Sequence, residues 1–225
     1  MRKTKASIII PAGGSGRRMG GKTAKQFLKI GDRTILERTL SIFNAHPRIA
    51  EIVLVLPPGR IKSMAPRLIA AYPKITGVVA GGATRVDSVT HGFHVLSKRV
   101  PVVLVHDCVR PFVTHRNISD VIVAASRYDA VTLGVPVKDT LKVVRGTRIM
   151  DTPDRSTLWH TQTPQGFKYD VLKKALALAK KHKRPVTDEC QLAERLSKNV
   201  HVVMGDYRNI KITTPEDLAW ARAIQ

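Results

Sequence analysis

The sequence predicts an α/β protein built on a doubly wound, mostly parallel, Rossmann-like sheet from which a β-arm protrudes. Three observations carry this prediction. Short apolar runs alternate with segments of helical periodicity over residues 7–135, as in a series of βαβ units. A glycine-rich segment follows the first apolar run, which is where open α/β sheets bind ligands. After Val135 the alternation stops, and a hairpin pattern replaces it.

The length and composition fit one domain. A chain of 225 residues can bury a sizeable core, and we expect a single domain over residues 1–225, with the β-arm inserted at about residues 137–161. Cys108 and Cys190 are the only cysteines and lie far apart, so no disulfide framework is indicated and a reducing cytoplasm fits. Pro11 interrupts the first apolar run, and no run is long enough to span a membrane. We therefore expect no membrane association.

The formal net charge of +21 indicates anionic partners. Anionic small substrates and nucleic acid both meet that description. No zinc-finger spacing, aromatic RNA-binding motif or heptad repeat accompanies the charge, and aromatic residues make up only 5% of the chain. Nucleic-acid binding therefore rests on charge alone. The basic residues between positions 173 and 184 fit a solvated helical face.

The glycine-rich loop, residues 11–25, reads PAGGSGRRMGGKTAK. Its glycines let backbone N–H groups approach a ligand, and its cations can neutralise phosphate oxygens. Residues 16–23 match the letters of a P-loop, but residues 24–31 lack the helical pattern that a P-loop requires. The dinucleotide-binding motif also fails, because Met19 stands where its third glycine belongs. We interpret the loop as a triphosphate cradle; considered alone, it is equally consistent with a solvated loop.

The elements up to Val135 follow one another in regular order. A capping box of Thr34 and Glu37 opens the first helix, and Thr84 pairs with Asp87 in the same way. The predicted strands are residues 7–10, 52–56, 78–79, 102–105 and 131–135. The predicted helices are residues 34–46, residues 60–71 with a proline inside, a helix starting at residue 84, and residues 118–128.

Beyond Val135 the chain is less regular. Residues 136–148 have the pattern of a β-hairpin, and we expect the β-arm to pack against a second subunit. Helices are predicted at residues 169–181 and 188–196, and strands at residues 202–204 and 209–212. The last helix starts with Thr214 as its cap and Pro215 at its first position.

Three short motifs follow predicted strands: the glycine-rich loop, the pair Gly81-Gly82, and residues 106–111. The carboxyl ends of parallel strands meet at one edge of a doubly wound sheet. We therefore expect these motifs to form one site.

The order and spacing of several motifs resemble one family, the 2-C-methyl-D-erythritol 4-phosphate cytidylyltransferases of the non-mevalonate isoprenoid pathway. In the first half the resemblance rests on the glycine-rich loop, on residues 81–88 and on residues 106–111. In the second half it rests on residues 136–140, 154–165, 187–189 and 209–211. It extends from Ser7 to about Leu218, nearly the whole chain.

The resemblance implies a nucleotidyltransferase-type fold and a homodimeric, Mg²⁺-dependent enzyme that transfers CMP from CTP to 2-C-methyl-D-erythritol 4-phosphate and releases pyrophosphate. Arg18 and Lys25 would stabilise charge on the α-phosphate, and Asp107 would be the protein ligand of Mg²⁺. The residues implied in nucleotide binding are Ala12, Gly13, Gly14, Gly82, Ala83, Ser88, Asp107 and Cys108. The residues implied in acceptor binding are Arg110, Thr140 and Lys211, with Arg155 of the partner subunit reaching the site through the β-arm.

The residue types support these roles independently. A phosphate oxygen is already ionised at neutral pH, so its attack on CTP needs no general base, and no Ser–His or Cys–His pairing is evident. The reaction needs in-line positioning and cations where charge grows on the phosphate oxygens. Considered singly, Asp107 could also cap a turn, and Thr140 suits a strand. Arg155 and Lys211 could be ordinary surface cations.

Three positions depart from the family pattern. Gly13 stands in the glycine-rich loop where alanine is more frequent. Cys108 stands where alanine or glycine is frequent, and we interpret it as a small buried neighbour. Ala83 stands where an acidic residue is common; it is harmless if position 83 contacts cytosine through its backbone, but a carboxylate contact would be lost. Two alternative functions stay open: transfer of CMP to ribitol 5-phosphate, and non-enzymatic binding of nucleic acid through the positive charge.

Overall fold

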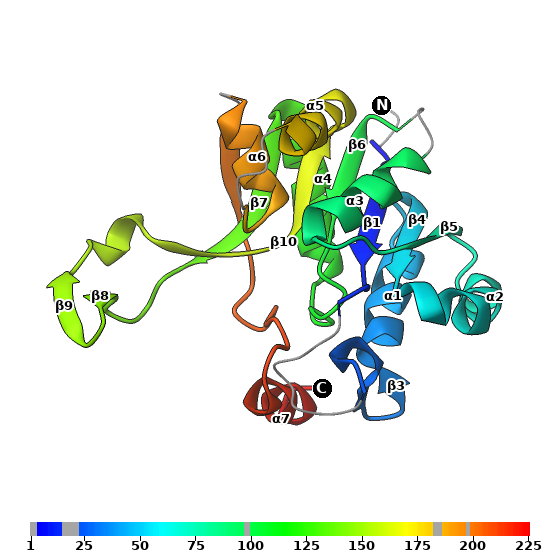
Figure 1. Cartoon of the computed structure of the whole chain (residues 1–225), viewed down its shortest axis with the longest axis horizontal. Helices are drawn as coiled ribbons and strands as arrows, with labels where there is room; N and C mark the ends of the chain where they lie inside the picture. The colour runs from blue at the N-terminus through cyan, green and yellow to red at the C-terminus, as the bar shows by residue number, and fades with distance from the viewer. Residues whose placement is uncertain (1–3, 15–22, 97–99, 182–185, 197–198) are drawn as a thin grey trace.

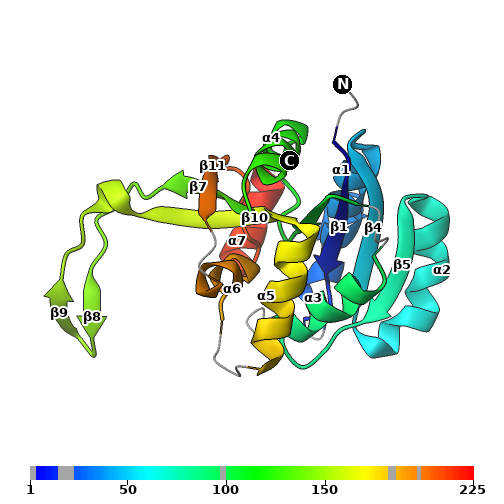
Figure 2. The same cartoon turned by 90° about the horizontal axis from the view of Figure 1, so that it is seen from above.

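The computed structural model describes residues 4–14, 23–96, 100–181, 186–196 and 199–225. Its centre is a seven-stranded sheet of order β11-β7-β10-β6-β1-β4-β5, with helices on both faces (Figures 1 and 2). The strands are β1 (Ala6–Pro11), β4 (Ile49–Leu56), β5 (Ile75–Ala80), β6 (Val102–Val105), β7 (Ala130–Pro136), β10 (Trp159–Lys168) and β11 (Val200–Met204). The predicted mostly parallel sheet is confirmed: β10 runs antiparallel to β6 and β7, and the other strand pairs of this seven-stranded sheet are parallel.

The helices lie where the helical patterns predicted them, within a few residues. They are α1 (Ile35–Ala45), α2 (Ile61–Ala71), α3 (Arg85–His94), α4 (His115–Arg127), α5 (Tyr169–Lys181), α6 (Glu189–Arg195) and α7 (Pro215–Ala223). Short 3-10 turns are η2 (Lys25–Phe27), η3 (Pro58–Arg60) and η4 (Arg155–Thr157). Both predicted capping boxes are present, so α3 begins at Arg85, directly after its cap Thr84. Among the described residues, no helix is long and apolar enough to cross a bilayer.

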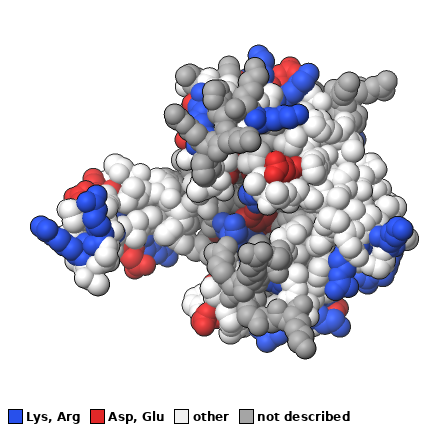
Figure 3. All heavy atoms as spheres, viewed as in Figure 1, with Lys and Arg blue, Asp and Glu red and all other residues white. Residues whose placement is uncertain are grey.

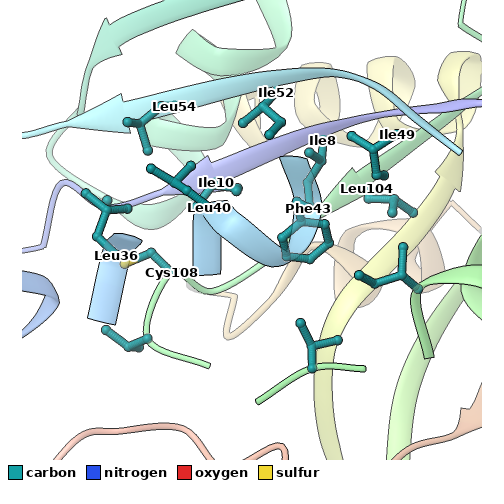
Figure 4. Close-up of a cluster of buried hydrophobic side chains, with 14 of the residues drawn as sticks. Ile8, Ile10, Leu36, Leu40, Phe43, Ile49, Ile52, Leu54, Leu104 and Cys108 are labelled. Carbon is teal, nitrogen blue, oxygen red and sulfur yellow. The ribbon is translucent and has the colours of Figure 1, made fainter. Parts of the chain in front are cut away.

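The residues of β1 contribute to a core on each face of the sheet. Ile8 and Ile10 pack with side chains of α1, among them Phe43, as Figure 4 shows. Ile9 points to the opposite face, into the cluster that holds Val89 and Phe93 of α3 and side chains of α5 and α6. Because successive side chains of a strand alternate between faces, a continuous apolar run can serve both layers.

The antiparallel strand β10 was not predicted. Its sequence, WHTQTPQGFK, shows neither an apolar run nor an apolar alternation. Its buried residues include Gln162, Thr163 and Gln165. These side chains are held inside the protein by hydrogen bonds and not by hydrophobic packing. The pairing of β10 with β7 is irregular between Gln162 and Gln165. A polar strand of this kind leaves no periodic signal in the sequence.

The predicted strand at residues 209–212 is wrong. The structure has no strand there; instead, the Ile212 N–H donates to the Val109 carbonyl at 2.9 Å, and the buried Asn209 amide donates to the Thr163 carbonyl at 2.9 Å. The apolar pattern that suggested a strand belongs to a segment that hydrogen bonds connect to the loop after β6 and to β10.

The β-arm leaves the sheet after β7 and returns as β10 (Figures 1 and 2). The predicted hairpin is present as β8 (Val143–Arg145) and β9 (Arg148–Asp151), with Gly146 at φ +61° in its turn. The smaller hairpin of β2 (Lys29–Ile30) and β3 (Arg33–Thr34) lies just before α1. The apolar side chains of β8 and β9 are exposed: Val143, Val144, Ile149 and Met150.

Candidate functional site

The glycine-rich loop and the Gly81-Gly82 turn meet above the end of β4. A Cβ atom on Gly13 would lie 3.3 Å from the Cα of Gly81, and the Gly81 N–H donates to the Leu56 carbonyl at 2.8 Å. Such a close approach of two backbones favours residues without a side chain. The expected convergence of these two motifs is therefore confirmed for the described residues. Arg18 and the rest of residues 15–22 lie outside them.

Polar side chains fix the backbone of both glycine segments. The Gln26 amide, which is buried, donates to the carbonyls of Ala12 at 2.7 Å and Gly14 at 2.9 Å. Ser88 accepts from the Gly82 N–H at 3.1 Å and donates to the Thr84 carbonyl. Gln26 was not among the predicted residues, and its only signal in the sequence is a polar residue next to Lys25.

Asp107 follows β6 and is the centre of a charged cluster. Its side chain is 6% exposed, and three cations contact it: Arg85 at Oδ1, and Lys211 at 2.9 Å and Arg110 at 3.5 Å from Oδ2. Burial by itself would raise the pKa of Asp107, but the charges of Arg85, Lys211 and Arg110 outweigh it and hold the pKa well below its usual range. Asp107 is therefore ionised at neutral pH.

A second carboxylate, Glu189 at the start of α6, contacts the same guanidinium. Arg85 donates to Glu189 Oε2 from Nη2 at 3.1 Å and from Nε at 3.3 Å. Burial raises the pKa of Glu189, and the charge of Arg85 opposes that shift. Three cations thus face two carboxylates, which leaves a positive excess suited to anionic ligands. Figure 3 shows basic and acidic side chains together in a hollow near the middle of the face that is in view.

Neutral groups behind Asp107 hold its backbone. The Asp107 N–H donates to Thr163 Oγ1 at 3.0 Å, and the same hydroxyl lies 3.0 Å from His106 Nδ1. Burial is the main cause that lowers the pKa of His106 to about 3. The imidazole is therefore neutral, and its Nε2 lies 3.1 Å from the Arg110 carbonyl.

Arg110 and Lys211 come from different segments and differ in burial. Arg110 is nearly buried, and its guanidinium donates to the Asn209 carbonyl at 2.8 Å and the Thr161 carbonyl at 3.3 Å. Lys211 leaves 43% of its side chain exposed. The structure therefore brings Arg110, Lys211 and Asp107 together, as the resemblance implied.

Cys108 is buried, as expected from the sequence. Burial raises the pKa of its thiol to about 12, so it is not a nucleophile. Thr39 donates to the Cys108 carbonyl at 2.8 Å and so fixes the backbone after Asp107. The positive charge of Lys25 acts on the same thiol, which places Lys25 within electrostatic reach of the cluster.

Two of the predicted site residues are not near the Asp107 cluster of their own chain. Thr140 and Arg155 belong to the β-arm, which extends away from the sheet in Figure 2, and both are exposed. Arg155 donates to the Lys138 carbonyl at 2.9 Å. Ala83 is exposed at the Gly81-Gly82 turn.

A magnesium ion bound in this site would contact Asp107, because the second carboxylate, Glu189, is fully buried. Among the described residues, no group of three or more His, Cys, Asp and Glu side chains could hold a metal. Both oxygens of Asp107 already contact cations. Mg²⁺ is commonly bound by one or two carboxylates together with substrate phosphates, so these residues fit the ion only when it arrives with phosphate oxygens.

Comparisons with known proteins agree with one another. The family model described as 2-C-methyl-D-erythritol 4-phosphate cytidylyltransferase matches residues 6–225. A protein of that name from Syntrophotalea carbinolica is 42% identical over 219 residues, which is 96% of this chain and 94% of the relative. Another, from Clostridium botulinum, is 44% identical over 218 residues, 96% of this chain and 95% of the relative.

Solved structures give the same result. The crystal structure of 4-diphosphocytidyl-2C-methyl-D-erythritol synthase from Anaerococcus prevotii is similar with a TM-score of 0.87 and 32% identity, and the match covers 99% of this chain and 96% of that one. The 2-C-methyl-D-erythritol 4-phosphate cytidylyltransferase from Thermus thermophilus has a TM-score of 0.81 and 35% identity, with 96% of each chain covered.

Proposed function

Because this chain belongs to the 2-C-methyl-D-erythritol 4-phosphate cytidylyltransferase family and therefore transfers CMP from CTP to 2-C-methyl-D-erythritol 4-phosphate in isoprenoid synthesis, we propose that its two substrates meet at the Asp107 cluster. The observation that carries this proposal is the convergence of Arg85, Arg110 and Lys211 on one buried carboxylate beside the two glycine segments. Two phosphorylated substrates need such a positive excess.

The glycine segments are suited to the nucleotide. The backbone of Ala12, Gly13 and Gly14 would hold the triphosphate, and that of Gly82 and Ala83, with Ser88, the cytosine. Asp107 and Cys108 would lie near the ribose. Ala83 is compatible with a backbone contact to the base, because the hydroxyl of Ser88 already fixes the neighbouring Gly82 N–H.

The transfer itself needs charge stabilisation rather than a base. An ionised phosphate oxygen of the acceptor attacks the α-phosphorus of CTP, and the bond from that phosphorus to the bridging oxygen breaks as pyrophosphate leaves with the electron pair. Lys25, with Arg18, would stabilise the charge that grows on the α-phosphate oxygens. Mg²⁺, held by Asp107 and the phosphates, would neutralise further phosphate charge.

The acceptor phosphate would bind on the other side of Asp107, at Arg110 and Lys211. Thr140 and Arg155 reach such a site only from a second subunit, because the β-arm extends away from its own cluster. The exposed apolar side chains of β8 and β9 support a homodimer through the β-arm. We therefore also propose a dimer of one-domain chains, acting in the cytoplasm.

Pyrophosphate release with CTP and Mg²⁺ tests the proposal, with 2-C-methyl-D-erythritol 4-phosphate and ribitol 5-phosphate offered in parallel. We expect turnover with the first acceptor, reduced about 100- to 1000-fold in Lys25→Ala, as for the loss of a group that stabilises transition-state charge. Lys29→Ala is the matched control, because Lys29 is exposed four residues away, and it should keep wild-type turnover.

Other outcomes are distinguishable. Turnover with ribitol 5-phosphate alone would overturn the acceptor and keep the reaction. No turnover with either, in folded protein that binds nucleic acid in a salt-dependent manner, would favour the binding protein that the charge first suggested.

A further inference from the structure

Arg85 is shared between two carboxylates that come from different parts of the fold. It is the first residue of α3, and its Nη1 contacts Asp107 Oδ1 after β6. Its Nη2 and Nε both donate to Glu189 Oε2, at 3.1 Å and 3.3 Å. A planar guanidinium serves two acceptors in directions that its rigid fork fixes, whereas the three donors of an ammonium group rotate about one nitrogen. The two bonds to Glu189 therefore set the direction in which Nη1 points.

Glu189 is itself held rigidly. It is fully buried, and the N–H groups of Glu189 and Cys190 donate to Gln165 Oε1 at 3.2 Å and 3.3 Å. Asp188 caps α6, because its side chain accepts from the Gln191 N–H. Glu189 Oε1 has no hydrogen-bond partner among the described residues. A buried carboxylate with one unused oxygen is costly for the fold, so its retention indicates a role beyond packing.

The two oxygens of Asp107 face different partners. Oδ1 contacts Arg85, whereas Oδ2 contacts Lys211 at 2.9 Å and Arg110 at 3.5 Å. Arg85 thus fixes the rotation of the carboxylate, and with it the oxygen that Lys211 and Arg110 share.

We propose that Arg85 and Glu189 are positioning residues for CMP transfer: Glu189 orients Arg85, and Arg85 orients the Asp107 carboxylate between the nucleotide and the acceptor. This inference rests on the proposed role of Asp107. It gives a function to residues 187–189, which carry part of the family resemblance but touch neither substrate in the proposed arrangement.

An apolar replacement of the pair separates positioning from stability. Exchange of a buried ion pair for apolar residues of similar size often leaves stability unchanged, so Arg85→Met combined with Glu189→Leu should keep the unfolding midpoint near that of the wild type. We expect its kcat/KM to fall about 10- to 100-fold, as for other partners that orient a ligating side chain. Arg85→Met alone, which strands Glu189, should lower the midpoint. If the double variant is stable and has wild-type kcat/KM, the pair is structural and the proposal is overturned.

A second variant keeps the test decisive if the double variant does not fold. Arg85→Lys retains the charge but removes the rigid fork that fixes the donor directions, and we expect about a tenfold loss of kcat/KM at an unchanged midpoint. In an Asp107→Asn background the same change should have no further effect, because the group that it positions has lost its charge. Equal losses in both backgrounds would contradict the proposal.

Two controls complete the experiment. Arg116→Gln with Asp120→Asn removes the exposed ion pair of α4 and should leave kcat/KM unchanged. Asp107→Asn alone distinguishes the two proposals: wild-type turnover in that variant would overturn the role of Asp107, whereas a loss in Asp107→Asn with full activity in Arg85→Lys would overturn only the positioning.

Discussion

The buried side-chain amide of Gln26 donates a hydrogen bond of 2.7 Å to the carbonyl oxygen of Ala12, at the start of the glycine-rich loop. The same Nε2 also donates to the Gly14 carbonyl oxygen at 2.9 Å. In a trans peptide the carbonyl and the following N–H point in opposite directions. By holding the Ala12 carbonyl inward, Gln26 turns the Gly13 N–H outward, toward the expected position of the triphosphate.

Gln26→Glu should weaken CTP binding. The glutamate keeps the shape of the side chain but loses both donors, and it sets a carboxylate against two carbonyl oxygens. Leaving buried groups without donors costs about 1–3 kcal/mol each, so we expect the Kd for CTP to rise at least about tenfold, which corresponds to ~1.4 kcal/mol. Isothermal titration calorimetry measures it. The change Gln191→Glu, at a half-buried position of α6, should have no effect, and an unchanged Kd in Gln26→Glu would contradict the role of Gln26.

Lys211→Ala and Arg110→Ala should differ in their effect on stability. Both remove a cation from Asp107 Oδ2, so both should raise the KM for the acceptor, by about 100-fold where a charged hydrogen bond of ~3 kcal/mol is lost. Arg110 also donates to two backbone carbonyls from a nearly buried position, whereas Lys211 is partly exposed. We therefore expect a lower unfolding midpoint only in Arg110→Ala, measured by differential scanning calorimetry.

Two inactive variants should complement each other if the active site is shared between subunits. In a mixed dimer of Lys25→Ala and Arg155→Ala chains, one site carries both changes and the other carries neither. Random pairing of the two variants should restore about a quarter of wild-type activity, as the two-fold symmetry of a dimer requires. The assay is pyrophosphate release after co-expression and purification of both chains.

The β-arm provides the control for this experiment. Ile149→Glu places a charge among the exposed apolar side chains of β8 and β9 and should yield monomers and abolish complementation. Ile69→Glu, at an exposed position of α2 outside the β-arm, should do neither. Complementation that persists when sedimentation shows only monomers would refute the shared site.

His46 should make stability depend on pH. Its Nδ1 accepts from the Arg48 N–H at 3.2 Å, and its Nε2 lies 3.2 Å from the His115 carbonyl, an arrangement that requires neutral imidazole. Burial is the main cause that lowers the pKa of His46 below its ordinary value. The unfolded chain therefore binds the proton more readily, and the free energy of unfolding should decrease as the pH falls below about 6.5.

Urea denaturation of wild type and His46→Gln at several pH values tests this expectation. The variant should be less stable near neutral pH, but its stability should vary less between about pH 7 and pH 5. His94→Gln, at the exposed end of α3, should retain the wild-type profile. A parallel profile for His46→Gln would show that another group is responsible.

Local signals in the sequence determined most of the sheet, the helix starts and the glycine segments. Apolar runs such as Ile8 to Ile10 form the strands because both faces of the sheet are buried. Thr34 and Thr84 cap helices through hydrogen bonds to residues three positions later. Residues that are close in the sequence are therefore sufficient to predict these helix starts. The order of the strand ends then placed Gly13, Gly81 and Asp107 at one edge.

Only the tertiary structure decided how the charged cluster is built. The polar residues Gln162, Thr163 and Gln165 of β10 make hydrogen bonds to distant loops and to the start of α6. Such long-range bonds leave no periodicity in the sequence. Glu189 lies 104 positions from Arg85, and nothing local predicts which buried cation a carboxylate will meet. Patterns within a few residues report local structure, whereas the partners of Asp107 depend on where distant segments pack.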